Sequence, residues 1–162
     1  MNLEPSAEDR VFERELELEE RELARLVELL ADEQRVLARR DDELLLGIAA
    51  EKAQHLTSLE RLSARRRQFL GHRGLRGDHE GMLAWIAAHP ERTGAARAWS
   101  RVEDLARTAR ATNDLNGALI ADELQRFQSR LSFLGAAASN DATYTPGGYT
   151  RPVPPQRTLG EA

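Results

Sequence analysis

The stretch "SAEDRVFERELELEERELARLVELLADEQRVLARRDD", residues 6–42, carries the strongest periodic signal in the chain. Its large apolar residues follow one another at intervals of four, seven, three, four and seven: Phe12, Leu16, Leu23, Leu26, Leu30 and Leu37. This spacing places them on one stripe of an α-helix, and the residues between them are mostly Glu and Arg. No Gly or Pro interrupts residues 6–46. We therefore predict a helix over residues 7–39, about 50 Å long at ~1.5 Å per residue.

The sequence "RRDD", residues 39–42, is the candidate end of this helix. Arginines suit the negative end of one helix dipole and aspartates suit the positive start of the next. A second apolar stripe follows and stops at the glycine-rich "GHRGLRG", residues 71–77; its members are Leu45, Ile48, Leu56, Leu59, Leu62 and Phe69. The two stripes predict a helical hairpin. A single unbroken helix stays open as an alternative, because "RRDD" contains no glycine.

The distribution of charge favours the hairpin. Residues 1–30 hold ten acidic and four basic residues, a net charge of −6, while residues 31–77 hold seven acidic and ten basic residues, a net charge of +3. An acidic helix lying antiparallel to a basic one would pair these charges. The many glutamates of the first helix are otherwise expected to form a solvated face, and "ARRRQF", residues 64–69, a polar helix face.

Two further helices are expected after the glycines. Asp78 is a candidate N-cap for a short helix, "HEGMLAWIAA", that ends before His89. A last long helix covers roughly residues 94–135, with a stripe at spacings of three, four and seven that comprises Trp99, Val102, Ala106, Ala109, Asn113, Asn116, Ile120, Phe127, Leu131 and Leu134. The expected fold is all-α: an elongated antiparallel hairpin, a long C-terminal helix and a flexible tail.

The tail is expected where the periodicity ends. Prolines and glycines beyond Gly135 leave too little apolar surface to offset the entropy of ordering. We therefore assign residues 1–137 to a helical domain and residues 138–162 to a flexible Pro/Gly-rich tail. Both tyrosines of the chain, Tyr144 and Tyr149, lie in this tail, where no core can form around them.

Composition excludes several classes of function. The 162 residues suffice for one domain, and a net charge of −4 argues against nucleic-acid binding. The absence of cysteine excludes disulfides and thiolate chemistry. No signal peptide or membrane span is visible, so a cytoplasmic protein without stable membrane insertion is expected. His79–Glu80 begins like a zinc-protease motif, but Leu83 stands where the second ligand is needed. We expect no catalytic residues, no metal and no cofactor.

Two asparagines in "TNDLNGALI" are the most informative polar residues. Asn113 and Asn116 fall on the apolar stripe, where an asparagine sets helix register at some cost in stability. The alternative is that the phase is one residue off and both face water. Gly117 costs ~1 kcal/mol relative to Ala inside a helix, and a close approach by another chain would explain it.

A second apolar face accompanies this stripe. Leu115, Leu119 and Phe133 lie off the main stripe, roughly on a neighbouring face of the same helix. Exposed apolar residues in such an array can receive an amphipathic partner helix. Alternatively, the short third helix covers them.

With these residues in place, the chain resembles the FlgN family of flagellar export chaperones. The segment "ATNDLNGALIADELQRFQSRLSFLGAA" followed by "ATYTPGG" is similar to the family's C-terminal signature, a long helix with an Asn-x-x-Asn-Gly element and then a Tyr with Gly a few residues on. Glu51–Lys52 matches a recurring Glu-Lys step in the family's second helix.

The resemblance implies a function and two partners. Members hold hook–filament junction proteins in the cytoplasm before secretion, bind their C-terminal amphipathic segments and deliver them to the cytoplasmic domain of the export gate. Tyr144 occupies the position of a family tyrosine that contacts the gate, whereas Tyr149 has no assigned counterpart. We place the cargo site on the last helix, at Leu115, Leu119, Phe127, Leu131 and Phe133. Two rival hypotheses stay open: a structural coiled-coil adaptor without a secretion role, and an enzyme or nucleic-acid binder, which the net charge and the missing motifs disfavour.

Overall fold

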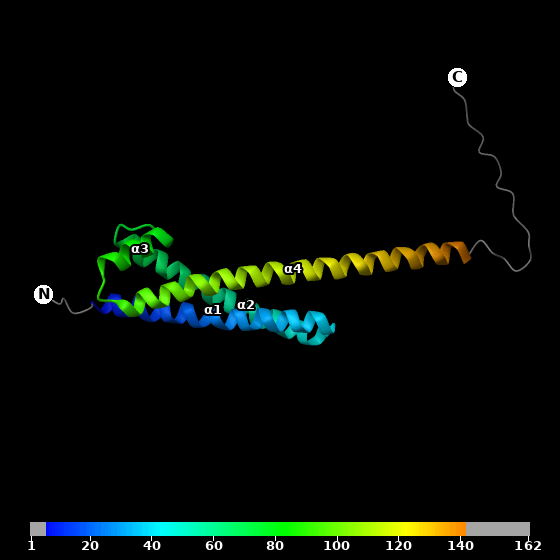
Figure 1. The fold of residues 1–162 in the computed structure, drawn as a ribbon, viewed down its shortest axis with the longest axis horizontal. Helices are drawn as coiled ribbons and strands as arrows, with labels where there is room; N and C mark the ends of the chain where they lie inside the picture. Colours follow the sequence, from blue (N-terminus) through cyan, green and yellow to red (C-terminus); the bar gives the residue numbers. More distant parts are fainter. Residues whose placement is uncertain (1–5, 142–162) are drawn as a thin grey trace, which may run out of the picture. The chain divides into compact units, whose positions relative to one another are not determined.

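The computed structural model describes residues 6–141, and the side chains of residues 6–135. Within this range the chain forms four helices and no strands: α1 (Ala7–Arg39), α2 (Asp42–His72), α3 (His79–Ala88) and α4 (Thr93–Asp141) (Figure 1). The predicted all-α class is confirmed. The chain divides into two compact units, Met1–Ala121 and Asp122–Ala162, and the boundary falls within α4.

The first unit is built on the predicted hairpin. α1 begins at an N-cap, Ser6, whose side chain accepts a hydrogen bond from the backbone of Asp9 at 3.1 Å, and it ends at Arg39 as predicted. Arg40 then adopts the left-handed conformation, with φ of 56°, and its N–H donates to the carbonyl of Leu37. Asp41 caps α2 by accepting from the backbone of Leu44. The chain therefore turns at "RRDD" without a glycine, and the unbroken helix is excluded.

The buried side of α1 is the predicted stripe. Phe12, Leu16 and Leu23 lie in one buried cluster, which also contains Leu70 of α2 and Trp85 of α3. The rings of Phe12 and Phe69 stack with centroids 3.7 Å apart, which brings the start of α1 beside the end of α2, as an antiparallel hairpin requires.

The stripe predicted for α2 is confirmed only in part: Leu59 and Phe69 pack against the buried cluster, but no member is fully buried. Five of its six members are only half-buried and Leu56 is exposed, whereas the buried apolar residue of α2 is Leu70. The reason is that α2 meets α1 largely through charged side chains such as Lys52 and Arg66, which pair with glutamates of α1. An apolar pattern alone could not reveal this face.

A short connection and α3 close one end of the hairpin. The carboxylate of Asp78 accepts from the backbone N–H of Gly81 at 3.2 Å, so the predicted cap is confirmed. A Cβ on Gly81 would lie 1.7 Å from the carbonyl oxygen of Arg76, which explains why glycine is needed there. α3 places Met82 and Trp85 in the core.

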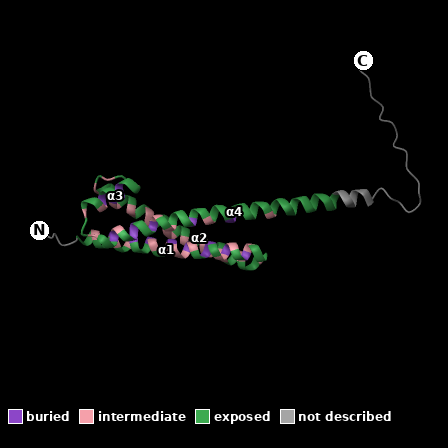
Figure 2. Cartoon of the chain, viewed as in Figure 1, coloured by how far each residue is buried: buried purple, intermediate pink, exposed green. Residues whose placement is uncertain are grey.

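Within the first unit, α4 lies along the hairpin and runs parallel to α1. Trp99 and Val102 join Phe12 and Leu16 in one buried cluster, and further along both helices Ala109 joins Leu26 and Leu30 in a second. Small residues at Ala95, Ala98 and Ala109 permit this packing. Figure 2 shows buried residues concentrated in α1 and in the first part of α4.

The last helix is longer than predicted. α4 begins at Thr93 and continues to Asp141, six residues past Gly135, because the alanines at 136–138 are strong helix formers. It therefore enters the segment expected to be the tail. Tyr144, Tyr149 and the rest of residues 142–162 lie outside the described residues, so the tail stays a prediction.

Candidate functional site

The second unit presents an apolar stripe that nothing in the described chain covers. Four large side chains at spacings of three, four and three residues share one face of α4: Leu124, Phe127, Leu131 and Leu134. Each is between 53% and 62% exposed. Such an array on one helix face is typical of a surface that another polypeptide covers.

All five residues predicted to hold cargo are exposed. Leu115 and Leu119 belong to the first unit, and Phe127, Leu131 and Phe133 to the second. The alternative that α3 covers them is wrong, because α3 packs Met82 and Trp85 into the core with Phe12 and leaves these residues exposed. Exposure is what a binding role requires, but it does not by itself assign the role.

The two asparagines have different surroundings. Asn116 is 1% exposed, as the register hypothesis requires, whereas Asn113 is exposed and its predicted place on the buried stripe was wrong. The cause is that the buried face turns gradually around a straight helix, so a position three residues away falls at its edge. Gly117 is also exposed, and a Cβ built on it would meet no atom within 4 Å other than its chain neighbours and the nearby backbone of its own helix.

Asn116 belongs to a buried polar triad that joins three helices, comprising Asn116 of α4, Glu33 of α1 and Lys52 of α2. Asn116 Nδ2 donates to Glu33 Oε2 at 2.9 Å and to the carbonyl of Leu30 at 2.8 Å. Lys52 Nζ donates to Glu33 Oε1 at 2.6 Å. Next to Lys52, Glu51 pairs with Arg25 at 2.7 Å. Lys52 of the Glu-Lys step and Asn116 of the Asn-x-x-Asn-Gly element, far apart in sequence, thus meet at Glu33.

Sequence reasoning missed Glu33, and it missed Glu19 for the same reason. Both were assigned to a solvated glutamate face, yet Glu33 is 4% exposed and Glu19 is 5% exposed. Glu19 accepts hydrogen bonds from Arg66 Nε and Nη2, and the Arg66 guanidinium lies 4.7 Å from the ring centroid of Trp99. The available signal was the helical phase: both glutamates lie on the side of α1 that faces a basic helix.

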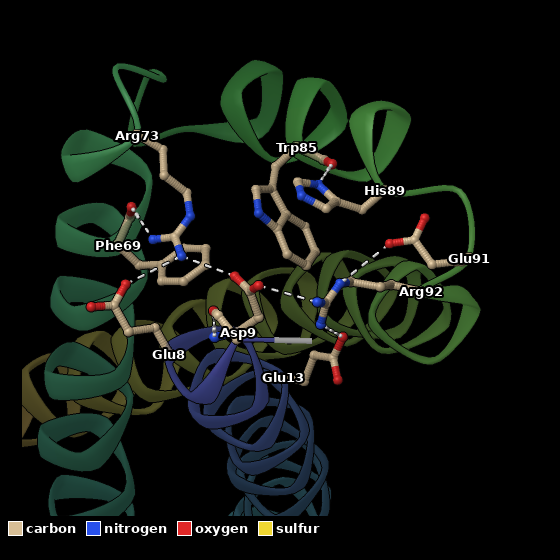
Figure 3. A network of polar contacts seen from close by, with 10 residues as sticks. Glu8, Asp9, Glu13, Phe69, Arg73, Trp85, His89, Glu91 and Arg92 are labelled. Carbon is tan, nitrogen blue, oxygen red and sulfur yellow. Dashed lines mark hydrogen bonds and ion pairs between the residues drawn. The ribbon is translucent and has the colours of Figure 1, made fainter. Parts of the chain in front are cut away.

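A second polar network ties the start of α4 to the start of α1 (Figure 3). The carboxylate of Asp9 accepts from Arg73 at 2.9 Å and from Arg92 at 3.1 Å, and Arg92 also donates to Glu13 at 2.6 Å. Burial acts to raise the pKa of Asp9, but a hydrogen bond with Ser6 and the charges of Arg92 and Arg73 outweigh it and hold that pKa below its usual value. This network is structural, because Arg73 and Arg92 each pair with at least two carboxylates of the chain itself.

The first unit also has a shallow depression between α1 and α2. It is lined by Val11, Phe12 and Phe69 and flanked by the ion pair between Glu15 and Arg65. Its charged rim is already paired, so it offers no converging polar groups. In the part of the chain that the structure describes, no cluster of three His, Cys, Asp or Glu residues is arranged to hold a metal ion.

Comparison with known proteins identifies the family of the chain. Residues 11–152 match the model of a protein family described as FlgN protein. The chain belongs to the FlgN family. FlgN proteins are flagellar export chaperones, so the resemblance seen in the sequence is confirmed. The FlgN match includes the triad, the exposed stripe of α4 and both tail tyrosines. No curated protein and no solved structure matches the chain significantly.

One property of this FlgN-family chain bears on membranes. Among residues 6–141, no helix combines the length and the apolar composition that crossing a bilayer requires.

Proposed function

We propose that this chain is the export chaperone of hook–filament junction proteins. It binds them in the cytoplasm, prevents their premature assembly and delivers them to the flagellar type III export gate. The observation that carries the proposal is the stripe of Leu124, Phe127, Leu131 and Leu134, because a chaperone with no client bound must keep apolar side chains exposed for one.

The chemistry of the stripe favours an amphipathic helix as client. Side chains at spacings of three and four residues match the anchors that a helix lays onto an apolar surface. The C-terminal segments of junction proteins, which the family resemblance implies as clients, have this amphipathic character. Leu115, Leu119, Phe127, Leu131 and Phe133 are the proposed client-binding residues.

The proposal is tested by size-exclusion chromatography with light scattering. The chain is run alone and with a C-terminal fragment of a junction protein, as wild type, as Phe127→Ala on the stripe and as Phe133→Ala on the neighbouring face. A one-to-one complex with wild type, weakened in Phe127→Ala while helicity by circular dichroism is retained, supports the proposal, and the result for Phe133→Ala shows whether the second face takes part. A stable homo-oligomer that ignores the fragment supports the coiled-coil adaptor instead.

Delivery is proposed to use Tyr144. A tyrosine in a polar segment brings rigid, amphipathic contact area to a partner at low side-chain entropy cost. We expect Tyr144→Ala to weaken binding of the chaperone–client complex to the cytoplasmic domain of the export gate, measured by titration. Equal affinities of wild type and variant would refute this role, and Tyr149→Ala is the matched control.

A further inference from the structure

The buried triad of Lys52, Glu33 and Asn116 is a costly way to pack three helices. Glu33 and Asn116 are almost fully buried, and Asn116 Oδ1 has no hydrogen-bond donor among the described residues. A buried set of polar groups is often no more stabilising than apolar side chains of similar volume, but it can select one arrangement of helices over others. The question is what arrangement this triad selects.

Apolar packing leaves the rotation of α4 about its own axis poorly determined at this point. Ala95, Val102, Ala109 and Asn116 are spaced by seven residues and all are buried. In a straight α-helix, residues spaced by seven rotate around the helix axis by ~20° per heptad. Over the two heptads from Val102 to Asn116, the presence or absence of supercoiling therefore changes the direction of residue 116 by about 40°. Asn116 is the only polar member of the series, and its bonds to Glu33 and Leu30 hold one orientation.

A competing orientation would hide apolar residues that the triad keeps outside. At 3.6 residues per turn, Leu119 lies about 60° and Leu115 about 100° around the helix from Asn116. Both are exposed, although the apolar residues Leu30 and Val36 are buried on the neighbouring helix α1. Turning α4 toward them would bury Leu119 and gain hydrophobic stabilisation. That turn would also remove Asn116 from the carboxylate of Glu33.

We infer that the Lys52–Glu33–Asn116 triad is a positioning device that keeps Leu115 and Leu119 turned outward for a client. The effect on client binding rests on the proposed function, whereas the effect on the orientation of α4 does not. Lys52 and Glu33 do not contact the client; they act by holding Asn116 in place. The start of α4 is held independently by Arg92, so the triad controls the helix where the client-binding residues begin.

The test combines a distance and an affinity. The chain has no cysteine, so spin labels attach only at introduced sites, here Ala31→Cys on α1 and Ala118→Cys on α4, both exposed alanines. Double electron–electron resonance then gives the distribution of distances between the two spin labels, and hence between α1 and α4. The affinity for a junction-protein C-terminal fragment is measured by calorimetry on the unlabelled chain.

Asn116→Leu is the decisive variant, and Asn113→Leu, the same change at an exposed position one turn earlier, is its control. We expect Asn116→Leu to broaden or shift the distances and to weaken client binding about tenfold or more, while its unfolding midpoint is maintained or raised. Asn113→Leu keeps the wild-type distances and affinity. Wild-type distances in Asn116→Leu overturn the inference, and so do altered distances with unchanged affinity.

Two further outcomes are a variant that does not fold and a wild-type chain that binds no client. If Asn116→Leu does not fold, the triple variant Lys52→Met, Glu33→Met, Asn116→Leu replaces the whole triad by apolar groups, and the same distances and affinities decide. If wild type binds no client fragment, the proposed function fails. The distance distributions then still show whether the triad fixes the orientation of α4.

Discussion

Replacing Glu19 by Leu should destabilise the fold far more than an ordinary surface substitution. Glu19 is 5% exposed and accepts from Arg66 Nε at 3.1 Å and Nη2 at 3.2 Å, while the Arg66 guanidinium lies over Trp99. Glu19→Leu leaves Arg66 in the interior without its counter-charge. Removing one partner of a buried ion pair lowers the free energy of unfolding by ~3–5 kcal/mol. In a chain of 162 residues, 1 kcal/mol lowers the melting temperature by about 2–4 °C. We therefore expect a decrease of roughly 6–20 °C.

A double-mutant cycle separates the pair from its surroundings. Arg66→Met should also destabilise, because it leaves Glu19 buried without a donor, whereas Glu19→Leu combined with Arg66→Met should recover most of the loss. Urea unfolding followed by circular dichroism gives the four free energies. If each single variant costs less than ~1 kcal/mol, as solvent-exposed pairs do, Glu19 is not buried in solution and the packing of α1 against α2 described above is wrong.

Three further results are expected. Gly81→Ala should lose ~1–3 kcal/mol by urea unfolding, because its Cβ would meet the carbonyl oxygen of Arg76 at 1.7 Å. Gly117→Ala, whose Cβ would meet nothing outside its own helix backbone within 4 Å, should gain up to ~1 kcal/mol in the same assay, and equal effects at the two glycines would contradict the α3 packing. The pKa of Asp9 is lower in the folded chain than its ordinary value of 3.8, so its contribution is present above that pH and is lost as pH falls through the folded value. The difference in unfolding free energy between wild type and Asp9→Asn should therefore be constant from pH 7 to pH 5 and shrink below about pH 4; a difference that grows on acidification would refute the network around Asp9.

The sequence determined the helices well because their signals are local. The stripe from Phe12 to Leu37, the cap at Asp78 and the dipole-compatible "RRDD" turn each depend on residues within a few positions of one another. The end of α4 was missed because a single glycine, Gly135, does not stop a helix when strong helix formers follow it, here the alanines at 136–138.

The polar interior could be predicted only in part. The asymmetry of charge between the first two helices indicated that acids and bases would face each other, and Glu19 with Arg66 does so. Which glutamates would be buried depends on the rotation of α1 about its axis and on the position of α4, and neither is a local property. Asn116 was identifiable because a polar residue in an apolar stripe stands out, but its partner Glu33 stands among many glutamates and does not.

Calorimetric titration of the chain with a C-terminal fragment of a junction protein decides whether α4 holds the client. Phe127→Ser and Leu131→Ser each remove an exposed anchor from the stripe, and Leu46→Ser on α2 removes an apolar side chain of at least equal exposure that lies outside it. We predict that each α4 variant weakens binding about tenfold or more, since loss of a large anchor dominates contacts of this kind, while Leu46→Ser binds as wild type does. Wild-type affinity in both α4 variants, with the fold intact, would contradict the proposed surface.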